Sequence, residues 1–353
     1  MINKIMPTDS NFTKSPVFLY GAGRICKDFV NICYFLGIYP DYICDHNSNL
    51  WGKYIEDLQI ISPDEMKTYG LDNPVIVTNC WKHSSICTLE KHGFTNIWVF
   101  PHIGTGGKTE AIINENKSTI KYVLDNLHDE RSRFVLNEIL RFRVDDNLEI
   151  VENIYEDEQY FPADIVSLSD NEVFIDGGAY NGSDTVKFID NVRNCFNHIY
   201  VFEPQPKMVE HLRTILHEHI EKNRVSIIER AISDKEEDVF FSVHLYSSTI
   251  NDLGQGVERI KVKTQSLDDH FASAAHKPTF IKFDIEYSEM AGLIGAEKTI
   301  DKYKPKLAIS IYHNLEDLWE IPHYLMKKYP FFDFYIRHHQ ISTVETILYA
   351  IPK

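Results

Sequence analysis

Thirteen residues with the sequence VFIDGGAYNGSDT, from Val173 to Thr185, constrain the fold of this chain more than any other segment. Their first three residues form an apolar run that is typical of a buried parallel strand. Three glycines then indicate a turn: Gly177, Gly178 and Gly182. Ser183 or Asp184 can cap a helix that follows. Strand, glycine turn and helix together predict a nucleotide-binding corner, although an ordinary strand-to-helix turn stays open.

Two acids indicate which nucleotide this corner would bind. Asp176 directly precedes the glycines, where a carboxylate repels phosphate and attracts a cationic ligand. S-adenosylmethionine fits, because it carries a sulfonium and an ammonium and has no phosphate. Glu203 closes the next apolar stretch, 199–202, where an acid can accept hydrogen bonds from ribose hydroxyls. The alternative for Glu203 is a cap for the helix that starts near Pro206.

Composition limits the classes of partner. Acids outnumber bases 52 to 36, and the net charge of −16 disfavours nucleic acid and anionic membranes. The six cysteines include no CxxC pair, so neither a zinc site nor a disulfide framework is predicted. The polar N-terminus lacks a signal-peptide core, and no apolar run is long enough to span a bilayer. We therefore expect a cytoplasmic protein without membrane insertion.

The first hundred residues alternate strands and helices, which implies a parallel α/β layer. The expected strands are residues 17–20, 42–44, 75–78 and 97–100, with a helix from the GAGR turn to about Phe35. Gly21 and Gly23 would approach a nucleotide and Asp45 would bind its ribose, as in an NAD-dependent oxidoreductase. Cys26 stands where a dinucleotide fingerprint has its third glycine, which disfavours intact NAD binding.

The motifs GAGR, CDHNSNLWGKYI and IISPDE also resemble the N-terminal nucleotide-sugar-binding domain of bacterial sugar acyltransferases. That resemblance implies recognition of a nucleotide-linked sugar, and a purely structural docking domain is the alternative. We predict a small Rossmann-like α/β domain at 1–105, a helical linker at 106–158 and a second domain at 159–353. The aromatic pair in QYFP, at 159–162, lies either over an adenosine or against the sheet edge.

The second domain is predicted to be a seven-stranded sheet of the class I methyltransferase type. Its further strands are expected at 225–228, 279–283, 307–311, 334–338 and 347–351, with a hairpin insertion at 240–244 and 260–264 that encloses SSTI. Helices are expected at 207–220, 290–303 and 316–328. Ala231 and Ile232 follow the third strand and are candidate adenine contacts.

Three strand ends should converge at the carboxyl edge of this sheet, where open α/β folds bind ligands. They carry Asp176, the pair Asp284 and Glu286, and Tyr312 with His313. A hydroxyl acceptor must lose its proton, and Asp284 or His313 could take it. The alternatives are a structural acid pair at a helix start and a capping histidine. We predict no metal, because acids before a helix are common for dipole reasons.

From about Tyr160 onward the chain resembles the FkbM-type methyltransferase family. The matching segments include VFIDGGAYNGSDTVKF, IYVFEPQPK, RAISD, FIKFDIE and KPKLAISIYH. The resemblance implies the class I fold, S-adenosylmethionine as methyl donor, and O-methylation, often of a sugar hydroxyl. It places Asp284 near the transferred methyl. The predicted cofactor-binding residues are Asp176, Gly177, Gly178, Gly182, Ser183, Thr185, Glu203, Pro204, Ala231, Ile232 and Asp284.

One departure concerns the acceptor side. The family usually has a glycine where this chain has Tyr287, which could shape an acceptor pocket, narrow it or signal lost activity. We predict an S-adenosylmethionine-dependent O-methyltransferase acting on a sugar or nucleotide-linked sugar, with catalytic residues Asp284, Glu286 and His313 and with homo-oligomerisation left open. The alternatives are a catalytically silent scaffold of a glycan-assembly complex and an NAD-dependent oxidoreductase.

Overall fold

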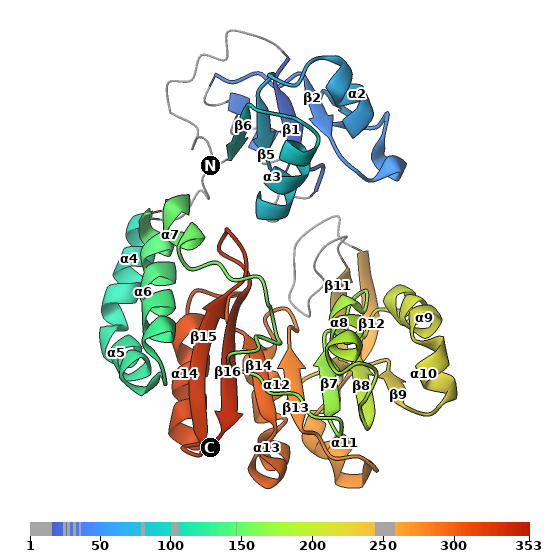
Figure 1. Cartoon of the computed structure of the whole chain (residues 1–353), viewed down its shortest axis with the longest axis vertical. Helices are drawn as coiled ribbons and strands as arrows, with labels where there is room; N and C mark the ends of the chain where they lie inside the picture. Colours follow the sequence, from blue (N-terminus) through green and yellow to red (C-terminus); the bar gives the residue numbers. More distant parts are fainter. Residues whose placement is uncertain are drawn as a thin grey trace. The chain divides into compact units, whose positions relative to one another are not determined.

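The computed structural model describes residues 16–23, 26, 29–30, 33–34, 37–78, 82–99, 106–145, 147–243 and 258–353. The chain divides into two compact units (Figure 1). Unit 1 comprises Met1–Glu110, Ile139–Tyr155 and Gln340–Val344; unit 2 comprises Ala111–Glu138, Glu156–His339 and Glu345–Lys353. The domain boundaries expected from the sequence stay a prediction.

Unit 1 is built on a six-stranded sheet with the order β3-β4-β2-β1-β5-β6. Its strands are β1 (Phe18–Tyr20), β2 (Tyr42–Cys44), β3 (Tyr54–Ile55), β4 (Leu58–Ile61), β5 (Val75–Val77) and β6 (Ile97–Val99). All pairs are parallel except β3 with β4. The predicted parallel layer is confirmed, and the β3–β4 hairpin is new. A two-residue strand has too little pattern to be read from the sequence.

Short helices join these strands. They are η1 (Ser48–Leu50), α2 (Pro63–Thr68) and α3 (Lys82–Lys91), and α7 (Leu148–Glu152) also belongs to unit 1. Ser62 caps α2 by accepting a hydrogen bond from the backbone N–H of Glu65. Arg24 and much of the helix expected to reach Phe35 lie outside the described residues.

Unit 2 contains a seven-stranded sheet with the order β15-β16-β14-β13-β7-β8-β9. Its strands are β7 (Val173–Gly177), β8 (His198–Phe202), β9 (Val225–Ile228), β13 (Phe280–Phe283), β14 (Lys306–Ser310), β15 (Phe332–His338) and β16 (Thr346–Pro352). Strand β16 runs opposite to the other strands of this sheet. The chain order doubles back beside β7, so a topological switch point lies between β7 and β13. The predicted class I topology is confirmed.

The helices around this sheet are α8 (Ser183–Asn191), α9 (Pro206–Ile215), α10 (His217–Glu221), α11 (Leu267–Ser273), α12 (Glu289–Ile294), α13 (Glu297–Tyr303) and α14 (Asp317–Lys328). Before the sheet come α4 (Gly106–Glu115), α5 (Lys117–Asn126) and α6 (Glu130–Asp145). Helix α5 packs against α14, which packs against β15 (Figure 1). These contacts cover the β15 end of the sheet.

Two helices predicted as continuous are each broken in two. The expected helix 207–220 divides at Leu216, and the expected helix 290–303 divides at Gly295 and Ala296. A Cβ at Gly295 would lie 2.1 Å from the carbonyl oxygen of Ser233. The chain after β10 therefore passes so close that only glycine fits at this break.

The predicted hairpin insertion is confirmed as a separate small sheet. Strand β11 (Asp238–Val243) pairs antiparallel with β12 (Glu258–Gln265), and β10 (Ala231–Ile232) pairs parallel with β12. Phe241 and Val262 pack with Ala231 in a core of their own. The SSTI segment, Ser247 to Ile250, lies outside the described residues.

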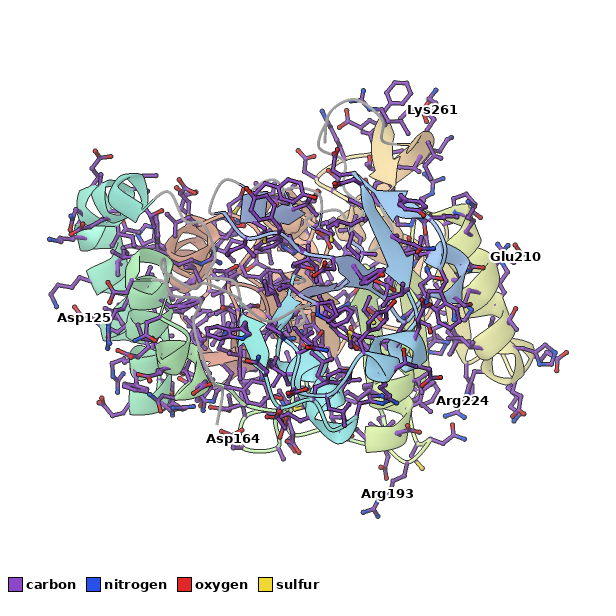
Figure 2. All side chains as sticks on the ribbon, turned by 90° about the horizontal axis from the view of Figure 1, so that it is seen from above. Asp125, Asp164, Arg193, Glu210, Arg224 and Lys261 are labelled. Atoms are coloured by element: carbon purple, nitrogen blue, oxygen red, sulfur yellow. The ribbon has the colours of Figure 1, made fainter. Side chains whose placement is uncertain are left out.

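Charged side chains on the rim of unit 2 point outward, as Figure 2 shows for Asp125, Arg193 and Glu210. Cys26, Cys33, Cys44 and Cys195 form no disulfide bond. Across the described ranges, every helix is too short or too polar to cross a bilayer.

Candidate active site

The glycine turn after β7 is shaped by close contact with β13. Gly178 has φ +76°, and a Cβ on it would lie 1.9 Å from the carbonyl oxygen of Asp284. A Cβ on Gly177 would lie within 3.0 Å of Ile232, Phe283 and the backbone of Lys282. Glycine at these two positions is thus required by the protein itself, whatever ligand the turn meets.

Helix α8 begins differently from the prediction. Gly182, with φ +80°, is the N-cap residue, and Ser183 is the first helical residue. The Asn181 side chain accepts a hydrogen bond from the Ser183 N–H at 3.1 Å. Capping by Ser183 or Asp184 is therefore wrong, because a left-handed residue is needed to turn the chain into the helix and glycine adopts that conformation without strain.

Asp176 lies in β7 and is wholly buried, with 0% of its surface exposed. Lys282 on the neighbouring strand β13 is 1% exposed and places its Nζ 3.0 Å from Oδ1 of Asp176. Thr185 donates a hydrogen bond to Oδ2 at 2.5 Å. The protein itself compensates the charge of Asp176, so this carboxylate presents no unpaired charge to a ligand.

Lys282 also links further groups of the site. Its Nζ lies 3.2 Å from Oδ2 of Asp184 and donates to the Gly178 carbonyl oxygen at 3.0 Å. The Tyr160 ring centre is 5.1 Å away. Burial opposes the charge of Lys282, but the surrounding carboxylates outweigh it and keep its pKa above the usual value. Burial raises the pKa of Asp184.

Glu203 follows β8 and is buried, with both carboxyl oxygens in use. The N–H of Tyr180 donates to Oε2 at 2.8 Å, and the N–H of Gln205 donates to Oε1 at 2.9 Å. The N-cap of α9 is Gln205 and no side chain caps this helix, so the capping alternative for Glu203 is wrong. Burial raises the pKa of Glu203 to about 7, although these hydrogen bonds oppose the shift. Each oxygen keeps a lone pair for a ribose hydroxyl.

The candidate adenine contacts, Ala231 and Ile232, follow β9 in the chain. Pro204, a predicted cofactor-binding residue after β8, is buried. Ile232 lies against the glycine turn, within 2.8 Å of a Cβ placed on Gly177. Ala231 packs instead into the core of the small sheet. Of the two predicted adenine contacts, Ile232 thus lies at the glycine turn after β7. Ala231 instead belongs to the core of the small sheet formed by β10, β11 and β12.

Asp284 sits just beyond β13 and is held by two tyrosines. The Tyr160 hydroxyl donates to Oδ2 at 2.7 Å, and the Tyr312 hydroxyl donates to Oδ1 at 3.1 Å. Burial favours the neutral carboxyl, but the charges of His313 and Lys282 and the two hydrogen bonds outweigh it and lower the pKa of Asp284. Asp284 is therefore a firmly ionised carboxylate.

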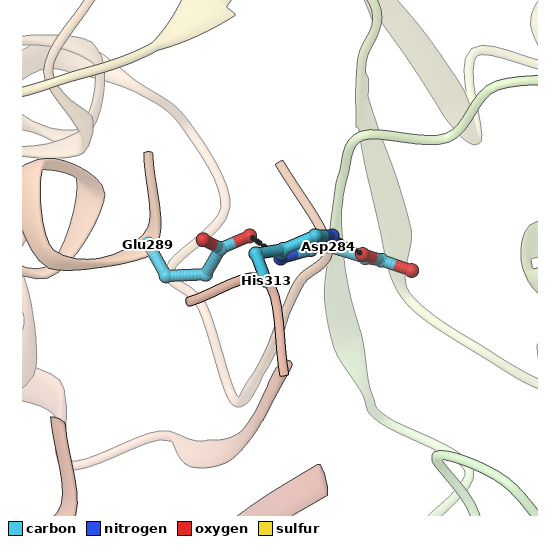
Figure 3. Close-up of side chains that lie close together, drawn as sticks. All are labelled: Asp284, Glu289 and His313. Atoms are coloured by element: carbon cyan, nitrogen blue, oxygen red, sulfur yellow. Dashed lines mark ion pairs between the residues drawn. The ribbon is translucent and has the colours of Figure 1, made fainter. Parts of the chain in front are cut away.

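His313 lies between two carboxylates (Figure 3). Its Nδ1 is 3.1 Å from Oε1 of Glu289, and its Nε2 is 3.5 Å from Oδ1 of Asp284. A third carboxylate, Glu286, lies 3.5 Å from Nε2. The side chain is 5% exposed, and this burial opposes protonation, but the carboxylates, Glu289 first, raise the pKa of His313 to about 10. His313 is thus an imidazolium near neutral pH.

The same three side chains are close enough to hold a metal ion. Asp284, Glu289 and His313 offer ligand atoms within 4.8 Å of one another. The imidazole ring, however, occupies the space between the carboxylates and turns one nitrogen toward each (Figure 3). The arrangement favours an imidazolium as the positive charge of this cluster over a divalent cation.

Glu286 and Tyr287 adopt left-handed backbone conformations, with φ +51° and +73°. Each costs about 1–2 kcal/mol in a residue that has a Cβ. Burial raises the pKa of Glu286 to about 7, with the negative charges of Asp284 and Glu289 adding to the shift and His313 opposing it. Tyr287 is 42% exposed, and its ring centre lies 5.3 Å from that of His313.

Residues 176–339 match the family model of the methyltransferase FkbM domain. This part of the chain is therefore similar to FkbM methyltransferase domains. The range begins at Asp176 and includes Glu203, Asp284 and His313. No curated protein sequence matches the chain.

One solved structure agrees with the observed fold. The crystal structure of methyltransferase FkbM from Methylobacillus flagellatus is 22% identical, with a TM-score of 0.65, and the match covers 95% of this chain and 89% of that one. Two others are more distant. An S-adenosylhomocysteine-bound methyltransferase from Podospora anserina has 12% identity, TM-score 0.33 and coverages of 68% and 96%. An O-methyltransferase from Bacillus cereus, in complex with the same compound, has 12% identity and a TM-score of 0.34, and the match covers 68% of this chain and 100% of that one.

Several groups at this site were not predicted. Lys282 is a charge inside the apolar run FIKF, which is a readable signal for a buried pair. Glu345 comes from the turn before β16; Gln159 donates to its Oε2 at 2.5 Å, and burial raises the pKa of Glu345 to about 8. No pattern in the sequence links Glu345 to Asp284, whose charge adds to that shift.

The two aromatic residues of QYFP, Tyr160 and Phe161, have different surroundings. Phe161 packs against the rings of Phe174, Phe188 and Phe280 in the core, whereas Tyr160 turns to Asp284. Tyr160 has φ +66°, so a left-handed backbone separates the two side chains. The packing alternative thus describes Phe161 alone.

The glycine turn of unit 1 lies apart from these residues in the chain. Asp45 is buried, and its two oxygens accept hydrogen bonds from the N–H groups of Ala22 and Asn47, both at 2.7 Å. Gly21 has φ +109°, and the N–H of buried Cys26 donates to the carbonyl oxygen of Gly23. Asp45 therefore stabilises the turn itself, and nucleotide binding here stays a prediction.

Proposed function

We propose that this protein is an S-adenosylmethionine-dependent O-methyltransferase that methylates a hydroxyl of a sugar or nucleotide-linked sugar. The observation that carries the proposal is an excess of carboxyl groups at the carboxyl edge of the sheet. Asp176, Asp284 and Glu289 are joined there by four acids with raised pKa values, namely Asp184, Glu203, Glu286 and Glu345. Lys282 and His313 are the cations placed against them.

This charge balance favours the proposed donor over a dinucleotide. With Asp176 and Lys282 neutralising each other, the carboxylates of Asp284 and Glu289 still face one imidazolium, His313. A sulfonium and an ammonium are attracted to such a site, and a pyrophosphate is repelled. Donor binding would use the predicted residues around the glycine turn, with Glu203 on the ribose hydroxyls.

Donor binding is tested by calorimetry with S-adenosylhomocysteine. We expect Glu203→Ala to weaken the affinity about 10- to 100-fold, because a buried carboxyl that bonds both ribose hydroxyls is lost. Glu210→Ala, on the exposed face of α9, is the matched control and should leave the affinity unchanged. An absence of heat with the unmodified protein would contradict the proposed donor.

Among the candidate bases, Glu286 is best suited to take the acceptor proton. Asp284 is a weak base because its pKa is lowered, and His313 already carries a proton. The pKa of Glu286 lies at about 7, near the working pH that favours general-base catalysis. The acceptor oxygen would attack the methyl carbon, the carbon–sulfur bond would break with its electron pair staying on sulfur, and Glu286 would hold the proton. His313 and Asp284 would position Glu286.

This role gives the rate a defined pH dependence. We expect kcat/KM to rise with pH through about 7 and then level off, because only ionised Glu286 accepts a proton. Glu286→Gln should lower kcat about 10²- to 10⁴-fold and leave S-adenosylhomocysteine affinity unchanged. Transfer of a labelled methyl group to a panel of sugars measures kcat and kcat/KM, and addition of EDTA is the control for metal dependence. A flat profile between pH 5 and 9 would exclude Glu286 as the base.

The scaffold alternative rests on Tyr287, whose ring stands beside the reacting groups. Formation of any labelled product would exclude a scaffold without activity. We further propose the domain limits 1–105, 106–158 and 159–353, a cytoplasmic location and a sugar-recognition role for the N-terminal domain. Nicotinamide fluorescence quenching tests the oxidoreductase alternative.

A further inference from the structure

We infer that the ring of Tyr287 is the platform on which the sugar ring of the acceptor stacks, and that this acceptor is an uncharged glycoside. The inference rests on the proposed function and narrows its substrate class. It starts from the backbone of Glu286 and Tyr287, where two successive side-chain-bearing residues adopt left-handed conformations, φ +51° and +73°. Strain of this kind persists where the surrounding structure enforces it and is concentrated at functional sites.

The position of the ring shows what this strain achieves. Tyr287 is 42% exposed, whereas Tyr160, Tyr312 and His313 beside it are buried. Its ring lies 5.3 Å from the His313 ring at an interplanar angle of 45°. Tyr287 therefore forms the outer wall of the cluster, adjacent to Glu286, the proposed base.

An aromatic ring beside a carboxylate is a common way to bind a sugar. The ring face packs against the C–H groups of the sugar, and the carboxylate accepts a hydrogen bond from a hydroxyl. Glu286, which precedes Tyr287 in the chain, supplies that carboxylate: it lies 3.5 Å from Nε2 of His313, whose ring centre is 5.3 Å from that of Tyr287. A hydroxyl of a stacked sugar would thus be presented to the base.

The surrounding charges favour an uncharged acceptor over a nucleotide-linked sugar. The charged side chains placed against His313 are the carboxylates of Asp284, Glu286 and Glu289. Asp317, at the start of α14, adds another carboxyl group close to Glu289 and His313. A diphosphate next to Tyr287 would be repelled by these groups, whereas a neutral glycoside would experience no electrostatic repulsion from them.

The test is binding of methyl glycosides of glucose, galactose, mannose and rhamnose, measured by saturation-transfer difference NMR with and without S-adenosylhomocysteine. Tyr287→Gly removes the ring and relieves the strain, so its Tm should equal or exceed that of the unmodified protein. We expect the dissociation constant of the best glycoside to rise at least about tenfold in Tyr287→Gly. Tyr287→Phe keeps the ring, so its dissociation constant for the same glycoside should stay within about twofold of that of the unmodified protein. UDP-glucose should bind more weakly than methyl glucoside.

Three results would overturn the inference. The first is that no glycoside binds the unmodified protein. The others are that Tyr287→Gly binds the glycoside as tightly as the unmodified protein, or that Tyr287→Phe loses as much affinity as Tyr287→Gly. Tighter binding of UDP-glucose would overturn the neutral acceptor. Failure of the proposed function is seen separately, as an absence of S-adenosylhomocysteine heat, since the glycosides are also measured without that compound.

Discussion

Lys282→Met lowers the free energy of unfolding of unit 2 by about 3–5 kcal/mol, because it leaves a buried carboxylate without its cation. Lys282 is 1% exposed and lies 3.0 Å from Asp176, which is 0% exposed. The Asp184 carboxylate, 3.2 Å from the same Nζ, loses its partner as well. Methionine keeps most of the side-chain volume, so the loss measures charge and not a cavity. Urea unfolding followed by circular dichroism gives the value.

A double-mutant cycle separates pairing from packing. Asp176→Asn combined with Lys282→Met should recover much of the stability, since no unpaired charge remains in that pair. Lys207→Met, at an exposed position of α9, is the matched control and should change stability by less than about 0.5 kcal/mol. Additive effects of the two single substitutions would show that Asp176 and Lys282 do not depend on each other.

Gly178→Ala is expected to destabilise unit 2 by about 2–5 kcal/mol and to abolish measurable S-adenosylhomocysteine binding. A Cβ would lie 1.9 Å from the carbonyl oxygen of Asp284, so β7 and β13 must separate at their carboxyl ends. The left-handed φ of +76° adds strain that no movement of neighbours relieves. Because Lys282 stands on the displaced strand and Asp284 directly follows it, we expect the donor site to be lost together with stability.

Gly52→Ala is the control for the backbone conformation alone. Gly52 has φ +78°, and nothing lies within 4 Å of a Cβ placed there. It should cost only about 1 kcal/mol in unit 1. Equal costs at Gly52 and Gly178 in urea unfolding would show that the contact with Asp284 does not limit the turn.

The local chemistry of the sequence determined the sheet and the place of its site. Apolar runs such as Val173–Gly177, followed by glycines, can only be buried strands that end in tight turns, and their order with intervening helices leads to the observed topology. Because parallel strands end at one edge, Asp176, Glu203, Asp284 and His313 could be assigned to a common site before any contact was known.

The charge states at this site were decided by the tertiary structure alone. Lys282 neutralises Asp176 because the two residues are paired in the register of β7 and β13, 106 positions apart in the chain. His313 becomes an imidazolium because Glu289 and Asp284 flank its ring within a buried space. A pKa is set by burial and by charges within a few ångströms, and neither quantity is contained in the spacing of residues along a sequence.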